Sequence, residues 1–259
     1  MAEPFLCANH EQISAVFLSD VHLRDADSVK SRLVIRFFQE VASRFEKIFI
    51  LGDLFDVWPG TTPYLTKEFK PVTDTLRGLV KDGHSVYYIE GNHDFRLGKY
   101  FTEELGIQVF AQSIEMQLGK YRVYMMHGDL GNPKEIGYKA LRFLLRRDTL
   151  HFALKAIPDK FIFDVGLKSS QVSRGYQSSR QSNKAEASIR QIYRQTAEQI
   201  FLKGYDVVLM GHTHLPDDVT TLVGGRQCRY INTGDWVRNF TYVEFDGERF
   251  TTRTHPVTQ

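Results

Sequence analysis

The sequence predicts an α/β fold, because short apolar runs alternate with segments of helical periodicity along most of its 259 residues. Each run has at most six residues and is followed by a Gly or Asp turn, as expected for a buried strand. Polar motifs at the ends of the first four runs stand 33 to 39 residues apart, a spacing typical of strand–helix–strand units. The predicted strands are 14–19, 47–51, 85–90, 121–126 and 206–210.

Helices are predicted between these strands by their apolar periodicity. In segment 29–45 the apolar side chains recur three or four residues apart, which places them on one helical face. Segment 66–81 is expected to be helical as well. Asn183 followed by Glu186 is a helix-start signal, and it predicts a long helix that reaches Leu202.

The C-terminal part of the chain has a different pattern. Apolar and polar side chains alternate there, which is typical of strands with one buried face. Asp246 and Gly247 form a turn signal within this part. We therefore expect a set of antiparallel strands at 229–232, 242–245 and 250–254.

One interval between the polar motifs is much longer than the others. His127 and His212 are 85 residues apart, more than twice the earlier spacing. The excess length predicts a helical insertion at 132–182 that lies over the ends of the strands. The core of the protein is then expected to consist of residues 1–131 and 183–259.

The composition is that of an ordinary globular protein with a net charge of +2, but the charge is unevenly distributed. Segment 130–203 holds 14 Lys and Arg against 6 Asp and Glu, and the remainder holds 19 against 25. This bias fits an anionic partner, although taken alone a solvated helical surface is the commoner explanation. Cys7 and Cys228 match neither a disulfide framework nor a zinc spacing. With no signal-like N-terminus and no apolar run of about 18 residues, we expect a cytoplasmic protein.

Five polar motifs follow the five predicted strands, and they carry the chemistry. Strand ends gather at one edge of an open α/β sheet, so these side chains should meet. They offer oxygen and nitrogen ligands without thiolate, which favours manganese, iron, zinc or cobalt over magnesium and calcium. Single motifs of this kind arise by chance, but all five in order predict a pair of divalent metal ions, most simply Mn²⁺. The motifs are Asp20-Val-His22, Gly52-Asp53, Gly91-Asn92-His93-Asp94, His127-Gly128-Asp129 and Gly211-His212-Thr213-His214.

The spacing within the motifs suggests how the ligands divide. Asp20 and His22 are two residues apart, so on a continuing strand both would face the same side. His212 and His214 have the same spacing, and the two carboxylate oxygens of Asp53 allow it to bridge both ions. We expect one ion to be held by Asp20, His22, Asp53 and His214, and the other by Asp53, Asn92, His127 and His212.

Such a pair of ions generates a hydroxide nucleophile and stabilises an in-line displacement at phosphorus. His93, next to the ligand Asn92, is assigned to catalysis, either stabilising the transition state or protonating the leaving group. Asp94 and Asp129 are expected to orient the imidazoles.

These motifs resemble those of the calcineurin-like metallophosphoesterase superfamily, and the resemblance covers essentially the whole chain. It implies a four-layer α/β/β/α sandwich in which the C-terminal strands complete the second sheet. A narrower resemblance, carried by residues 50–58, 92–99 and 211–216, is to the UDP-2,3-diacylglucosamine pyrophosphatases of lipid A biosynthesis. That resemblance implies cleavage of the pyrophosphate bond to give UMP and 2,3-diacylglucosamine 1-phosphate. One departure is His93, where well-known members of that family carry arginine.

The narrower resemblance also implies that the insertion forms a cap that receives two acyl chains and holds the glucosamine phosphate. Candidate substrate contacts are Tyr138, Arg174, Arg180 and Lys184. For Arg146, a solvated or membrane-facing position is at least as plausible as contact with substrate.

The expected partners are therefore an anionic nucleotide-linked glycolipid and the inner-membrane surface, to which the protein would bind peripherally. A second hypothesis keeps the chemistry but replaces the substrate with soluble nucleotide pyrophosphates or phosphodiesters. A third, a nuclease that binds nucleic acid through the basic segment, ranks lowest because apolar stretches interrupt the basic residues. The sequence leaves the oligomeric state open.

Overall fold

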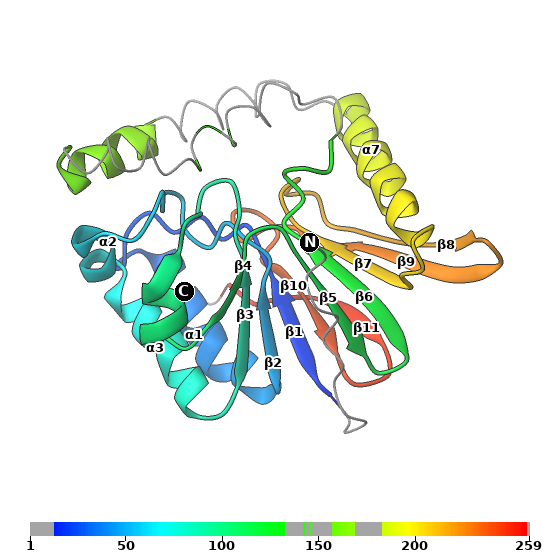
Figure 1. The fold of residues 1–259 in the computed structure, drawn as a ribbon, viewed down its shortest axis with the longest axis horizontal. Helices are drawn as coiled ribbons and strands as arrows, with labels where there is room; N and C mark the ends of the chain where they lie inside the picture. The colour runs from blue at the N-terminus through cyan, green and yellow to red at the C-terminus, as the bar shows by residue number, and fades with distance from the viewer. Residues whose placement is uncertain are drawn as a thin grey trace.

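The computed structural model contains two β-sheets, with helices on the outer face of each (Figure 1). It describes residues 13–132, 142, 144, 146, 157–168 and 183–257. The first sheet has six strands, and the parallel strands β1 to β4 are extended at one edge by β10 and β11, which run antiparallel. Their order is β11 (Phe250–Thr254), β10 (Thr241–Phe245), β1 (Ala15–Leu18), β2 (Lys47–Ile50), β3 (Ser85–Ile89) and β4 (Gln108–Phe110).

The second sheet has five strands. Three parallel strands, β6, β7 and β9, form its centre, and antiparallel β5 and β8 lie at its edges. The order is β5 (Ser113–Leu118), β6 (Tyr121–Met126), β7 (Val207–Met210), β9 (Arg226–Asn232) and β8 (Asp217–Val223). All five strands that apolar runs predict are present, as β1, β2, β3, β6 and β7.

The strand pleat divides the apolar side chains among three layers of core. In β1, Phe17 joins a cluster between the sheets, whereas Val16 joins a cluster beneath the helices α1 (Val29–Glu40) and α3 (Lys70–Lys81). In β7, Leu209 faces the first sheet, and Val208 belongs to a cluster under helix α7 (Asn183–Phe201). The predicted four-layer α/β/β/α arrangement is therefore confirmed.

The single helix predicted at 66–81 is two helices in the structure. Helix α2 (Pro63–Glu68) ends before α3 begins, and Pro71 lies in the first turn of α3. Proline has no amide hydrogen and disfavours a helical conformation in the residue before it, so it is accommodated at the start of a helix and not inside one. The periodicity continues across the break, which explains why the pattern alone missed it.

The expectation that all C-terminal strands complete the second sheet is wrong for two of them. Strand β9 does pair with β7, but β10 pairs with β1 and so belongs to the first sheet with β11. The intervening loop crosses between the sheets: Thr233 donates its N–H to Met210 of the second sheet, and Trp236 donates its N–H to Asp20 beyond β1.

Part of the predicted insertion is described and packs on the core. Residues 159–168 are helical, and the buried Phe163 lies with its ring centroid 5.4 Å from that of Tyr64 and 6.1 Å from that of Phe69. The limits of the insertion at 132 and 182 stay a prediction. Among the described residues, none of the helices combines the length and apolarity needed to span a lipid bilayer.

Candidate metal centre

The predicted ligands lie where strands of both sheets end. In the first sheet, β1 leads into Asp20, β2 into Asp53 and β3 into Asn92, while β6 and β7 of the second sheet lead into His127 and His212. The two sheet edges meet, since Asp53 Oδ2 lies 3.4 Å from His127 Nε2. Residues that are distant in the sequence therefore converge at one edge of the sandwich.

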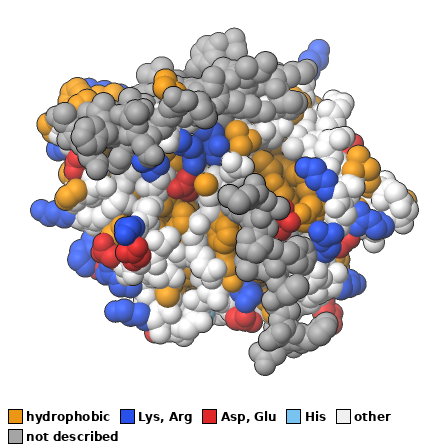
Figure 2. Space-filling model, in the orientation of Figure 1, with side chains coloured by type: hydrophobic (Ala, Val, Ile, Leu, Met, Phe, Trp, Pro, Cys, Tyr) orange, Lys and Arg blue, Asp and Glu red, His pale blue; other side chains and the backbone are white. Residues whose placement is uncertain are grey.

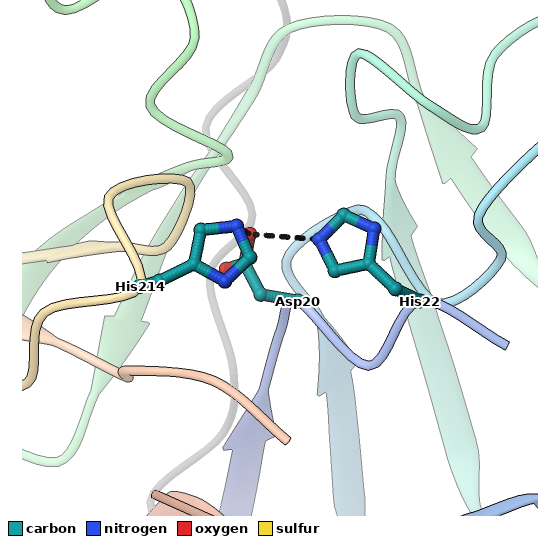
Figure 3. A group of neighbouring side chains, drawn as sticks. All are labelled: Asp20, His22 and His214. Carbon is teal, nitrogen blue, oxygen red and sulfur yellow. Dashed lines mark ion pairs between the residues drawn. The ribbon is translucent and has the colours of Figure 1, made fainter. Parts of the chain in front are cut away.

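Asp20 lies between two imidazoles (Figure 3). Its Oδ1 atom is 3.9 Å from His22 Nε2 and 3.6 Å from His214 Nε2, and the His22 nitrogen is 3.8 Å from Asp53 Oδ2. These separations exceed hydrogen-bond lengths, and they approach the roughly 3.0–3.6 Å expected between two ligand atoms bound at about 2.1 Å to one ion. Asp20 Oδ1 and His22 Nε2 are also buried without a hydrogen bond to the described part of the chain. The arrangement fits a divalent cation.

A second group of donors surrounds Asn92. Its Oδ1 atom lies 3.0 Å from His127 Nε2 and 2.8 Å from His212 Nδ1. Asp53 Oδ2 is 3.4 Å from the same His127 nitrogen and 3.8 Å from His22 Nε2, so this carboxylate faces both groups. The structure thus brings all seven predicted ligands into one cluster, with Asp53 in the middle.

Asp56, which the sequence analysis missed, orients two histidines. Its buried Oδ1 atom lies 3.2 Å from His22 Nδ1, and its backbone carbonyl accepts a 2.9 Å hydrogen bond from Nδ1–H of His93. Arg24 donates from Nε to the other carboxylate oxygen at 3.0 Å. A partner on Nδ1 directs the Nε2 atom of His22 towards the cluster, as is usual for metal-binding histidine. An acid in the otherwise apolar run 54–58 was the available signal.

The other imidazoles have similar anchors. His127 donates Nδ1–H to the carbonyl of Leu51 at 2.7 Å, and His214 Nδ1 lies 3.3 Å from Asp235 Oδ2. Asp235 was also missed by sequence reasoning, because it follows β9 and stands outside the five motifs. In both histidines Nε2 is left to face the carboxylates of the cluster.

Backbone strain is concentrated at the cluster. Among the described residues, seven that are not glycine have positive φ, and five of these are predicted ligands. Such conformations cost of order 1–3 kcal/mol each and persist where the surrounding structure imposes them. These φ values also correct the geometry expected from the sequence. The predicted ligands that stand two residues apart lie in left-handed turns and not on continuing strands. The five are Asp20 (φ 55°), His22 (53°), Asp53 (55°), His212 (68°) and His214 (59°).

Comparison with known proteins now decides the family. The family model for calcineurin-like phosphoesterases matches residues 13–216, which include both groups of the cluster. The chain belongs to the calcineurin-like phosphoesterase family. It is accordingly a metal-dependent hydrolase.

Among curated relatives, this phosphoesterase is similar to three proteins named UDP-2,3-diacylglucosamine hydrolase. The protein from Ectopseudomonas mendocina (strain ymp) is 30% identical over 91% of this chain and 95% of the relative. That from Stenotrophomonas maltophilia (strain R551-3) is 28% identical over 93% and 98%, and that from Azotobacter vinelandii (strain DJ / ATCC BAA-1303) is 28% identical over 95% and 100%. Among solved structures, an archaeal phosphodiesterase has a TM-score of 0.43 at 15% identity, covering 93% of this chain and 99% of that chain.

Two glycines allow the phosphoesterase to bring its carboxylates close to neighbouring strand ends. A Cβ atom on Gly91 would lie 2.0 Å from Asp53 Oδ1, and one on Gly211 would lie 2.4 Å from Asp20 Oδ2. Both distances are far below contact, so the position of each carboxylate requires glycine opposite it. The glycines of two predicted motifs thus serve the geometry of the cluster.

Asp94 has a different role from the predicted one. Its carboxylate accepts hydrogen bonds from the backbone N–H groups of Asp53, Phe55 and Gly91 and from the hydroxyl of Tyr88 at 2.5–3.1 Å. It therefore fixes the loops that carry the ligands and not the imidazoles themselves. Burial, followed by the charge of Asp53, raises the pKa of Asp94 to about 7.

Asp129 lies beside the second group. Its Oδ2 atom is 2.7 Å from Nε of Arg142, and its negative charge favours the protonated forms of His127 and His212. The role expected for Asp129, that of orienting the imidazoles, stays a prediction.

Charges inside the cluster shift its pKa values in opposite directions. Burial disfavours the charged form of His127, but Asp53, Asp20 and Asp129 together outweigh it and raise the pKa of His127 to about 10. Burial and the charge of His127 together lower the pKa of His212 to about 4. Burial opposes the ionised form of Asp53, yet His127 and its neighbours hold the pKa of this carboxyl well below its usual value. Without an ion, the cluster keeps a proton close to Asp53.

Of the four predicted substrate contacts, only Lys184 is among the described residues. Lys184 is exposed near the start of α7, and Tyr138, Arg174 and Arg180 lie outside the described residues. Their contacts with substrate stay predictions. The solvated position considered for Arg146 is not what the structure shows. Its side chain is 17% exposed and forms an ion pair with Glu90.

Proposed function

We propose that this chain hydrolyses the pyrophosphate bond of UDP-2,3-diacylglucosamine, giving UMP and 2,3-diacylglucosamine 1-phosphate. The observation that carries the proposal is the convergence of seven histidine, aspartate and asparagine ligands at one edge of the sandwich. Support for the substrate comes from the names of relatives that match at least 91% of the chain. The family match supports phosphoester or pyrophosphate hydrolysis in general.

Two divalent ions complete the proposed site, with manganese our first choice and iron, zinc or cobalt as alternatives. When bound, such ions lower the pKa of water and stabilise negative charge on phosphoryl oxygens. Asp53 would contribute to both positions. The first position would use Asp20, His22, Asp53 and His214, and the second Asp53, Asn92, His127 and His212.

His93 is the proposed proton donor of the reaction. Its Nδ1–H is held by the carbonyl of Asp56, so Nε2 is the nitrogen that can face substrate. Its backbone N–H donates to Asp53 Oδ1 at 2.9 Å, which fixes the ring beside the cluster. The side chain is 25% exposed, in contrast to the nearly buried His22. With attack at the α-phosphorus, a protonated His93 would donate to the bridging oxygen that leaves with 2,3-diacylglucosamine 1-phosphate, or to the oxygens that gain charge.

Peripheral binding to a lipid surface is part of the proposal. Ile157, Phe161 and Val165 expose 37%, 60% and 49% of their surface on or beside the helical residues 159–168. Figure 2 shows hydrophobic side chains in the upper left, where this helix lies in Figure 1. Exposed apolar residues on a helix of this kind suit a substrate with acyl chains and a membrane interface.

The substrate test presents manganese-loaded protein with UDP-2,3-diacylglucosamine, UDP-glucose and single-stranded DNA in parallel. UMP release confined to the acylated nucleotide supports the proposal. Equal turnover of UDP-glucose would replace it with the second candidate, a hydrolase of soluble nucleotide pyrophosphates or phosphodiesters. That candidate is favoured by His93, a titratable donor where the resembling pyrophosphatases have a fixed arginine. Cleavage of DNA alone would reject both.

The role of His93 is tested separately with His93→Ala. We expect kcat to fall by about 100-fold or more while the bound metal is unchanged, because the ring is proposed to act on substrate and not as a ligand. Metal content by elemental analysis is the second readout. Loss of an ion in this variant would show that His93 is a ligand, which its position near His22 and Asp53 also permits.

A further inference from the structure

Two arginines of the inserted segment reach the loops that carry the second group of ligands. Arg142 lies with Nε 2.7 Å from Asp129 Oδ2 and donates from Nη2 to the carbonyl of Ala111 at 3.1 Å. The side chain of Arg142 is 12% exposed and that of Asp129 is 4% exposed. This ion pair is therefore largely shielded from solvent.

Arg146, one helical turn further along, makes the corresponding contacts with the loop after β3. It forms an ion pair with the buried Glu90, and its Nη2 donates to the carbonyl of Gly91 at 3.1 Å. Its guanidinium lies 5.3 Å from the ring centroid of Phe95. Arg96 in turn donates to the backbone carbonyl of Arg146 at 2.8 Å, so this turn is held from both sides.

The acidic partners of the two arginines stand close in the sequence to two of the proposed metal ligands. Glu90 stands two residues before the ligand Asn92, and Asp129 stands two residues after the ligand His127. Arg142 and Arg146 thus bind the two loops that carry Asn92 and His127, whose Oδ1 and Nε2 atoms lie 3.0 Å apart. The first group is supported elsewhere, where Arg24 pairs with Asp56 beside His22.

We propose that Arg142 and Arg146 are positioning residues for the second metal ion, which links the insertion to the assembly of the catalytic centre. The inference rests on the proposed two-metal function. Removing either arginine takes the opposite charge away from a buried carboxylate, although Glu90 keeps the hydrogen bond from the backbone N–H of Leu97. Such a loss displaces the loop or draws in water. Mutation of the residues that support metal ligands typically lowers metal affinity by about 10- to 100-fold. The effect is expected at the second position only.

The test measures Mn²⁺ binding by equilibrium dialysis in two backgrounds that each retain one position. His214→Ala disables the first position, and His212→Ala disables the second. We expect Arg146→Met to weaken the remaining ion by about 10-fold or more in the His214→Ala background. In the His212→Ala background it should leave the remaining ion unchanged. Glu90→Gln, which preserves shape, should act in the same direction.

Controls separate positioning from general stability. Arg229→Met removes an arginine that binds Asp218 through two nitrogens and donates to the carbonyl of Phe250, and it should change the binding of neither ion. Arg146→Lys should restore part of the affinity. Equal weakening in both backgrounds, or no weakening in either, would overturn the inference. Absence of bound Mn²⁺ in the unmodified protein would instead overturn the proposed function, and the inference with it.

Discussion

His22 Nδ1 lies 3.2 Å from a carboxylate oxygen of Asp56, and both side chains are nearly or fully buried. Asp56 also holds His93 through its backbone carbonyl. One residue outside the five motifs therefore supports a proposed ligand with its side chain and the proposed proton donor with its main chain. A change of the Asp56 side chain separates these two effects.

We predict that Asp56→Asn weakens Mn²⁺ binding by about 10- to 100-fold, because the amide loses the negative charge that supports His22. The backbone contact to His93 is expected to survive. Isothermal titration measures the affinity, and Asp218→Asn, which removes a carboxylate paired with Arg229 between β8 and β9, is the control. Unchanged Mn²⁺ affinity in Asp56→Asn would show that His22 needs no such support.

The raised pKa of His127 predicts proton release when metal binds. Its pKa is about 10 in the folded protein against 6.5 for a free histidine, so the proton stabilises the metal-free fold. This contribution to the free energy of unfolding is fully present below about pH 6.5 and is lost as the pH rises through about 10. A metal ion must displace the proton in that window, so metal affinity should increase with pH there.

Calorimetry of Mn²⁺ binding at pH 8 in two buffers with different ionisation heats measures this release. We expect about one proton per protein from His127. Identical binding enthalpies in the two buffers would mean that no proton is released and that His127 is neutral before metal binds.

Gly91 and Gly78 form a matched pair of glycines. A Cβ on Gly91 would lie 2.0 Å from Asp53 Oδ1, whereas one on Gly78 in α3 would meet no atom within 4 Å. Gly91→Ala should therefore abolish binding of both ions, and Gly78→Ala should preserve it and stabilise the fold by about 0.5–1 kcal/mol. Metal content and thermal denaturation check the two expectations. Full metal content in Gly91→Ala would contradict the tight placement of Asp53.

We expect alanine substitutions of two phenylalanines of the insertion to have different effects, one on stability and the other on lipid binding. Phe163 is 4% exposed and packs on Tyr64 and Phe69, so Phe163→Ala should lower the free energy of unfolding by about 3 kcal/mol. Phe161 is 60% exposed, so Phe161→Ala should leave stability unchanged and reduce binding to anionic lipid vesicles. Denaturant titration and vesicle co-sedimentation measure these effects. Equal vesicle binding by the two variants would argue against Phe161 as a membrane contact.

Much of the fold could be predicted because buried parallel strands are continuous apolar runs. β5 (Ser113–Leu118) was missed because it is not a continuous apolar run: it lies at a sheet edge and buries only every second side chain. β8 (Asp217–Val223) was missed because it is rich in Asp and Thr and none of its residues is buried. The placement of β10 depends on a loop that crosses between sheets, and no local pattern encodes that crossing.

Motif order predicted which side chains converge in the cluster, but it did not predict their geometry. The strand alternation assumed for Asp20 and His22 does not apply, because both residues have positive φ. Asp56 and Asp235 orient imidazoles, whereas Asp94, which belongs to a motif, binds backbone amides instead. Such partners depend on which loops meet in three dimensions, and the sequence shows only which residues adjoin one another.

The most direct test is the number of Mn²⁺ ions bound by the unmodified protein and by Asp53→Asn, measured by elemental analysis after equilibrium dialysis. Asp53 lies 3.4 Å from His127 and 3.8 Å from His22, between the two groups. We predict about two ions per chain in the unmodified protein and loss of metal from both positions in the variant. Retention of two ions by Asp53→Asn, or a single ion in the unmodified protein, would contradict a bridged pair.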